Sequence, residues 1–241
     1  MRAYRSFVAT LTSLALVLPA PLLALAAGSE LAPATNDDNA RRCDTLAASP
    51  YDSQYSGPRA VLDDISVVEA LRVCAQAAEA QPVRPRYLYL YGRTLWKAKR
   101  HAEAAQQYSA AREAGNAWGA FGLGVLSAEG AGVPQSNENA ASLYREAASA
   151  GVAAAYARLM WLSFGATPPS YTEAARWAQQ AADAGDSDGA RVLGWCYLTG
   201  NGLRQDPGLA ANWYVEAARQ GSPDAMYQLS LMSCEDRKSV V

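Results

Sequence analysis

The sequence predicts an all-α protein built as a right-handed α-solenoid of stacked antiparallel helix pairs. Alanine-rich segments that each end in glycine recur along the chain, and these glycines are 36, 34 and 36 residues apart. Apolar residues follow helical spacing from about Ser66 onward, and helix-capping residues recur at matching places. A repeat of this length is typical of stacked helix pairs, because one pair alone cannot bury its apolar face. The glycines that mark the period are Gly115, Gly151, Gly185 and Gly221.

Each repeat unit divides into two helices joined by a turn. In the clearest unit the first helix ends at the glycine turn 200–203, and the second helix begins with Asp206 as N-cap and Pro207 at its first position. The turn 130–133 has the same pattern in an earlier unit. A glycine at the end of a helix adopts the left-handed conformation at little cost, so the recurrent glycines predict helix ends.

Two further second helices are predicted from the capping-box pattern, in which a serine N-cap is followed three residues later by a glutamate. The pairs are Ser66 with Glu69 and Ser170 with Glu173. With these helices included, the sequence predicts about ten helices between Ser66 and Cys234, and no strand.

The repeated pattern resembles the Sel-1-like repeat family, a relative of the tetratricopeptide repeats, over roughly residues 65 to 234. The unit that ends at Gly185 departs from the pattern, with Leu159-Met160 in place of Leu-Gly and the segment 165–169 in place of the glycine turn. The resemblance implies a scaffold that binds other proteins, because such folds mostly present surfaces and do not carry fixed chemistry. The residues that carry it in the best unit are Leu193, Gly194, Tyr197, Ala211, Trp213, Tyr214, Ala217, Ala218 and Gly221.

One face of the first helices is rich in aromatic residues and arginine. Residues two and five positions before or after the leucine of each first helix lie opposite it, at about 100° per residue. The resemblance implies that this face lines a concave groove, in which Ala154 and Ala157 also lie. The residues predicted to bind a partner there are Tyr89, Arg93, Trp96, Trp118, Phe121, Trp161, Phe164, Arg191, Trp195 and Tyr227.

Two interpretations of this stripe stay open at the level of sequence. First helices that are apolar on both sides are either buried on both sides by their neighbours or meet a partner. Because tryptophan, tyrosine and arginine are the residues that anchor interfaces, the stripe predicts a protein or peptide partner, with an envelope component as one candidate.

The chain begins with features of an export signal. Arg2 and Arg5 precede an apolar run over 7–18, and small residues at Ala24 and Ala26 fit cleavage, so residues 1–27 are predicted to be a signal peptide and the protein periplasmic or secreted. The alternative is an uncleaved membrane anchor. Residues 28–64 are predicted to be a linker and irregular leading segment, residues 65–234 the repeat domain, and residues 235–241 a tail.

Four cysteines are present, and an even count in an exported chain favours disulfides. We expect Cys43 and Cys74 to be bridged, which would fasten the leading segment to the first helix of the repeat domain. Cys196 fits a small core residue, and whether it pairs with Cys234 is left open.

The sequence contains no convincing motif for catalysis or for binding a cofactor. The single histidine, His101, lies in a predicted turn without a partner constellation, no zinc-like cysteine spacing occurs, and no metal or cofactor is predicted. With 21 basic and 23 acidic residues the chain has no excess positive charge for nucleic acid. The second hypothesis is a cell-wall-related or β-lactamase-like envelope enzyme, although the SxxK and KTG motifs of that serine chemistry are absent.

Overall fold

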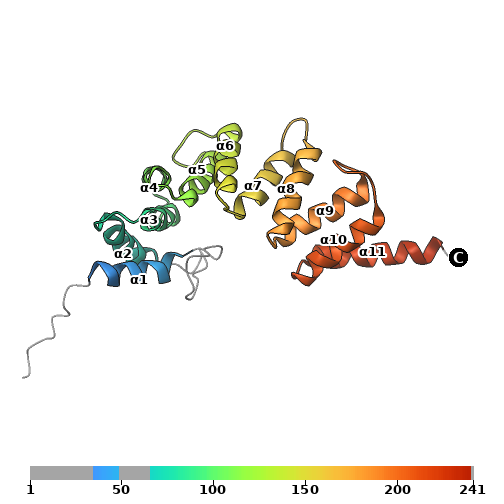
Figure 1. Ribbon diagram of the computed structural model, residues 1–241, viewed down its shortest axis with the longest axis horizontal. Coiled ribbons are helices and arrows are strands. Elements are labelled where there is room, and N and C mark those ends of the chain that lie inside the picture. The colour runs from blue at the N-terminus through green and yellow to red at the C-terminus, as the bar shows by residue number, and fades with distance from the viewer. Residues whose placement is uncertain (1–34, 49–65, 240–241) are drawn as a thin grey trace, which may run out of the picture. The chain divides into compact units, whose positions relative to one another are not determined.

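The computed structural model describes residues 35–48 and 66–239, and every regular element in these two ranges is a helix (Figure 1). This confirms the predicted all-α class, and the ten helices expected from Ser66 onward are α2 to α11. All of them belong to one compact unit that begins at Thr35. The helices are α1 (Asn36–Ala47), α2 (Val67–Glu79), α3 (Pro85–Lys97), α4 (His101–Glu113), α5 (Ala117–Glu129), α6 (Asn137–Ser149), α7 (Ala154–Phe164), α8 (Tyr171–Asp183), α9 (Ser187–Thr199), α10 (Pro207–Arg219) and α11 (Pro223–Ser239).

The helices pack in sequential pairs, from α1 with α2 to α9 with α10, and each second helix also packs against the first helix of the next pair. First helices of neighbouring pairs touch as well, α1 with α3, α3 with α5, and α7 with α9. Short connections join consecutive helices, which therefore fold back on one another (Figure 1). This is the predicted solenoid of stacked pairs.

The prediction that residues 28–64 form a linker and irregular segment is wrong over α1. Thr35 and Asp38 make a full capping box, with the Thr35 hydroxyl accepting a hydrogen bond from the Asp38 N–H at 3.2 Å. Ala40, Cys43 and Ala47 then form a buried stripe against the repeats. α1 is thus the first helix of a complete pair with α2, and the repeat architecture begins one helix earlier than the sequence predicts.

The disulfide predicted between Cys43 and Cys74 is present, with Cα atoms 4.9 Å apart, and it joins α1 to α2. Cys196 is a buried free thiol, in agreement with its predicted place in the core. Cys234 and the predicted signal peptide, residues 1–27, lie outside the part of the chain whose side chains are described. No described helix combines the length and the apolar character needed to cross a membrane. The predicted tail starts too early, because α11 continues to Ser239.

The glycine turns are built as the sequence predicts. Gly130 and Gly200 close α5 and α9 in the left-handed conformation, with φ of 68° and 79°. The second glycine of each turn serves a different purpose, because a Cβ on Gly202 would lie 2.2 Å from the carbonyl oxygen of Tyr171 at the start of α8. These turns therefore pack directly against the preceding helix pair. Only glycine leaves room for this close contact between neighbouring units.

The predicted capping signals differ in their outcome. Asp206 caps α10 by accepting a hydrogen bond from the Leu209 N–H at 2.9 Å, as expected. Ser66 and Ser170 do occupy the N-cap positions of α2 and α8, but neither side chain makes a capping hydrogen bond. The capping boxes predicted there are therefore wrong, although the helix starts are right.

This contrast yields a matched pair of variants. We expect Asp206→Ala to lower the free energy of unfolding by about 1 kcal/mol, because it removes a capping hydrogen bond. Ser170→Ala serves as control at the equivalent N-cap and should change stability by clearly less. Urea unfolding followed by circular dichroism measures both, and equal losses for the two variants would contradict this account.

A glycine and a tyrosine share one core position in most pairs. A Cβ on Gly124 would lie 2.6 Å from the ring of Tyr144, and one on Gly194 would lie 2.8 Å from the ring of Tyr214. The α7–α8 pair solves the same packing problem with Met160 on its first helix and alanine on its second, both fully buried. In this unit the large side chain is therefore on the first helix and the small one on the second, the reverse of the other units.

Candidate partner-binding site

The predicted partner-binding stripe does not form one accessible surface. Its N-terminal end is buried: Tyr89 is 5% and Arg93 6% exposed. Trp96 is partly buried and packs against the same core cluster. The prediction that Tyr89 and Arg93 face a partner is therefore wrong. The Tyr89 ring packs on Tyr108 of α4 and Trp118 of α5. Arg93 contacts α1, which the sequence analysis takes as linker and which packs against α3 (Figure 1).

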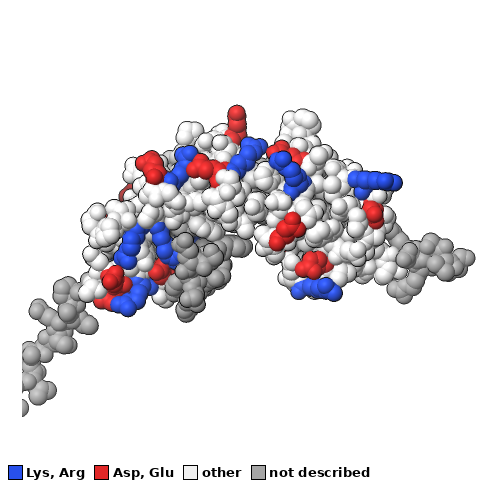
Figure 2. All heavy atoms as spheres, in the orientation of Figure 1, with Lys and Arg blue, Asp and Glu red and all other residues white. Residues whose placement is uncertain are grey.

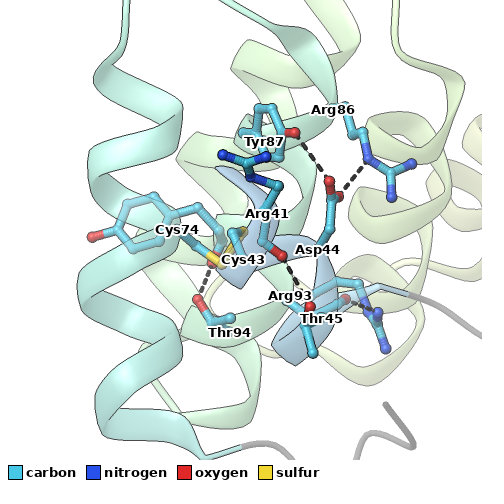
Figure 3. The surroundings of a disulfide bond; sticks show 11 residues. Arg41, Cys43, Asp44, Thr45, Cys74, Arg86, Tyr87, Arg93 and Thr94 are labelled. Carbon is cyan, nitrogen blue, oxygen red and sulfur yellow. Dashed lines mark hydrogen bonds and ion pairs between the residues drawn. A yellow bond between two sulfur atoms is a disulfide. The ribbon is translucent and has the colours of Figure 1, made fainter. Parts of the chain in front are cut away.

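Polar contacts fasten α1 to α3 at this end (Figure 3). The Arg93 guanidinium donates a hydrogen bond to the carbonyl oxygen of Ala47. Asp44 accepts hydrogen bonds from Arg86 Nε at 2.8 Å and from the Tyr87 hydroxyl at 3.0 Å. Burial, and next the negative charge of Asp44, raise the pKa of Tyr87 to about 12, so the phenol stays a donor at neutral pH. Arg93, which the sequence assigns to a foreign partner, instead contacts the chain's own first helix.

The middle of the stripe consists of aromatic rings that pack on one another. Trp118 lies 5.6 Å from Tyr89 and 5.5 Å from Phe121, measured between ring centroids, and the Phe121 ring lies 5.7 Å from that of Tyr144. Each of these distances is within the range of favourable aromatic pairs. Trp118 and Phe121 keep part of their surface accessible.

A second aromatic group joins α7, α8 and α9. Phe164 lies 5.8 Å from Trp161 and 5.6 Å from Trp195, and Tyr171 completes the group at 5.8 Å from Trp195. Trp195 is partly buried within this group, whereas Trp161 is 45% exposed. The Arg191 guanidinium sits 5.9 Å from the Trp161 ring, at the outer limit of a cation–π contact.

Beside Trp161 lies a cavity of about 390 Å³, which we call the α7 cavity. It lies along α7, between Phe121 of α5 on one side and residues 184–188, which lead into α9, on the other. Its volume is that of a site for a small ligand or a few peptide side chains. The residues that line it are Phe121, Ala153, Ala154, Ala157, Arg158, Trp161, Ala184, Gly185, Asp186 and Asp188.

Five lining residues belong to the face that the sequence predicts to be a groove: Phe121, Ala154, Ala157, Trp161 and Asp188. Arg158 was missed, because it stands next to the core leucine and not opposite it. Alignment of the units would have revealed it, since Leu90 and Val192 hold the same position in α3 and α9 and are both buried. Arg158 is exposed.

The charged groups of the cavity are partly engaged with one another. Asp186 caps α9 by accepting the Gly189 N–H at 2.8 Å, and Asp188 pairs with Arg191 at 3.2 Å. Arg158 makes no ion pair with any described residue. Over the molecular face drawn in Figure 2, acidic and basic side chains are interspersed, and no large area of one sign is seen on that face.

At the C-terminal end the predicted residue Tyr227 is 61% exposed on α11, with Leu231 42% exposed one turn further on. Tyr227 is thus accessible at the place where the sequence predicts the end of the stripe. Met226, 51% exposed, lies on the side of α11 that corresponds to Ala190 in α9. Ala190 is fully buried within its helix pair, so the exposure of Met226 reflects the lack of a following helix among the described residues.

The candidates for chemistry lie apart from the cavity. His101 begins α4, far along the chain from α7, and its backbone carbonyl carbon lies against Gly132. Burial raises the pKa of the Cys196 thiol to about 11, which leaves it a poor nucleophile at neutral pH. Within residues 35–48 and 66–233, no three His, Cys, Asp or Glu side chains form a group that could hold a metal ion.

Comparison with known proteins supports the predicted repeat family. The Sel1 repeat family matches residues 119–152, 153–186 and 187–222, three consecutive repeats that include the divergent α7–α8 unit. A curated relative is chitin synthase regulatory factor 3 of Schizosaccharomyces pombe, 34% identical over 77 residues, which are 32% of this chain and 8% of that protein.

Two solved structures share the fold. A Sel1 repeat protein from Oxalobacter formigenes aligns over 83% of this chain and 56% of its own, with a TM-score of 0.64 and 20% identity. A protective antigen of uropathogenic Escherichia coli strains, which displays the SLR fold, aligns over 82% of this chain and 41% of its own with the same score and identity. The chain therefore spans about half or less of the length of these relatives, and at this identity the likeness concerns the fold.

Proposed function

We propose that this chain, in which three consecutive segments match the Sel1 repeat family, is an exported scaffold that holds a protein or peptide segment in the α7 cavity. Sel1 repeat proteins in general bind protein partners. The observation that carries the proposal is the exposure of Trp161. This residue is 45% exposed at the wall of a cavity, whereas the equivalent Trp195 is partly buried against Phe164 and Tyr171.

An exposed tryptophan beside an apolar hollow is a favourable anchor for a partner. Its large ring loses much water contact when it is covered, and it has little conformational freedom to lose. Alanines 153, 154, 157 and 184 leave space around it, so that an incoming side chain would meet the ring without rearrangement of the helices.

Export is supported by the N-terminal sequence, in which a basic start, an apolar run and small residues precede Ala27. The Cys43–Cys74 bridge also fits this location, because disulfides persist in oxidising compartments. We propose that the mature protein starts near residue 28 and acts in the periplasm or outside the cell, where an envelope component is a candidate partner.

Replacement of Trp161 tests the site. Peptide ligands selected from a displayed library against the chain from residue 28 onward should bind Trp161→Ala about thirtyfold more weakly than wild type, as expected for the loss of an anchor worth about 2 kcal/mol. Isothermal titration calorimetry provides the affinities. Leu209→Ala is the matched control, because Leu209 is also about half exposed, at 40%, but lies on a second helix outside the cavity.

The stability of each variant is measured alongside. Trp161 is half exposed but also packs on Phe164, so its replacement should lower the urea midpoint modestly and leave the variant folded. Equal peptide affinities for wild type and a folded Trp161→Ala variant would exclude this site.

A further inference from the structure

The α7 cavity exists because the divergent unit carries small residues where its neighbours carry large ones. Ala154 and Ala157 stand on α7 five and two positions before the core leucine. At the corresponding positions, α5 has Trp118 and Phe121, and α9 has Asp188 and Arg191. Two methyl groups thus replace larger side chains, and the space they leave is the cavity floor.

The same helix places a charged residue where the other units have none. Arg158 directly precedes the core leucine Leu159, and the equivalent residues Leu90, Gly122 and Val192 are all buried. An arginine at this position is not needed for packing, because it is exposed and makes no ion pair with the described residues. Its charge does reach the interior: burial raises the pKa of Tyr144 to about 12, and Arg158 opposes that rise.

The other two charged residues of the lining already have partners. The Asp186 carboxylate accepts a backbone N–H at the start of α9, a position at which the helix dipole also stabilises its negative charge. Asp188 is paired with Arg191, which also lies 4.0 Å from Asp224. The guanidinium of Arg158 is therefore the charged group of the cavity that is free to meet a ligand.

We propose that the α7 cavity recognises a peptide segment in which an Asp or Glu side chain lies close to a large apolar side chain. This inference rests on the proposed function and gives the chemical class of the ligand. The apolar side chain packs on Trp161 over the floor formed by Ala154 and Ala157. The carboxylate accepts hydrogen bonds from the Arg158 guanidinium, whose paired N–H groups match a carboxylate in geometry.

The probes are three pools of short fluorescent peptides, acetylated and amidated at their ends, with one shared mixture of aromatic and aliphatic residues. The pools differ in one residue type, which is Glu, Gln or Lys. We expect the wild-type chain from residue 28 onward to bind the Glu pool about fivefold more tightly than the Gln pool, and the Lys pool most weakly. The preference should shrink as NaCl is raised, because salt screens an exposed ion pair.

Two variants assign the effect to the cavity. Arg158→Glu should reverse the order, so that the Lys pool binds best, while Ala157→Phe should weaken all pools by filling the floor. Arg204→Glu is the matched control, because Arg204 is also exposed and without an ion pair to the described residues, but lies between α9 and α10 outside the cavity. It should retain the wild-type order.

The outcomes separate this inference from the proposed function. Equal affinity for the Glu and Gln pools, or a preference for Lys in wild type, overturns the acidic ligand, whereas the loss on Trp161→Ala still upholds peptide binding. A Gln pool with a free carboxyl terminus that binds as tightly as the Glu pool would overturn the assignment to a side-chain carboxylate. If no pool binds and no selected peptide depends on Trp161, both the ligand class and the proposed site are wrong.

Discussion

Reduction of the Cys43–Cys74 disulfide is expected to lower the free energy of unfolding by about 3–4 kcal/mol. The bridge spans a sequence separation of 31 residues, and a loop of about that length loses this much entropy in the unfolded chain when it is closed. Urea unfolding of the chain from residue 28 onward, with and without dithiothreitol, measures the effect. The control is the Cys43→Ala/Cys74→Ala double variant, whose urea midpoint should not respond to the reductant.

The same bridge makes a local prediction about α1. Once the covalent link is gone, α1 is held only by its buried apolar residues and by polar contacts such as those of Asp44 and Ala47 to α3. We therefore expect α1 to exchange its amide hydrogens faster on reduction than α9 does. Non-reducing peptide mapping of protein recovered from an oxidising compartment should find the two cysteines joined. Free thiols at both positions there, or a urea midpoint indifferent to reductant, would contradict the role of the bridge and weaken the case for export.

The sequence predicts the repeats well because the signals that end and start their helices are local and recurrent. Glycines with positive φ, such as Gly151 and Gly221, and the Asp206 cap are needed wherever the chain turns, so they recur at a constant spacing. The α1 helix lacks such a signal. Its buried residues are Ala40, Cys43 and Ala47, too small to give a clear apolar period, and its one strong mark is the capping box at Thr35.

The direction in which a side chain points from its helix is easier to predict from sequence than its accessibility to solvent. The positions opposite the core leucines could be named from helical periodicity, and Trp161 and Tyr227 are exposed there. Accessibility depends on neighbours that the local pattern does not include. Arg93 is covered by a helix from another part of the chain, and Trp161 stays open because two alanines precede it on α7.

Substitutions that change the sizes of the side chains at Gly194 and Tyr214 should also have large effects on the free energy of unfolding. Tyr214 is 1% exposed, and Tyr214→Ala is expected to cost about 3–5 kcal/mol, as for other large aromatic truncations in a core. Gly194→Met alone should cost about 1–3 kcal/mol or more, because its Cβ would lie 2.8 Å from the Tyr214 ring. The double variant should be more stable than the sum of the two losses predicts, by about 1–3 kcal/mol, because the new methionine fills the space that the ring leaves.

The α7–α8 pair is the natural form of this double change. Met160 and Ala178 stand at the positions of Gly194 and Tyr214, and both are fully buried. The control combines Gly194→Met with Tyr144→Ala, the same two chemical changes in different units, and these losses should simply add. Urea unfolding in trimethylamine N-oxide keeps destabilised variants folded enough to compare. A coupling near zero within the Gly194–Tyr214 pair would mean that the units do not tolerate exchange of volume between their two helices, and that the divergence of the α7–α8 pair has another physical cause.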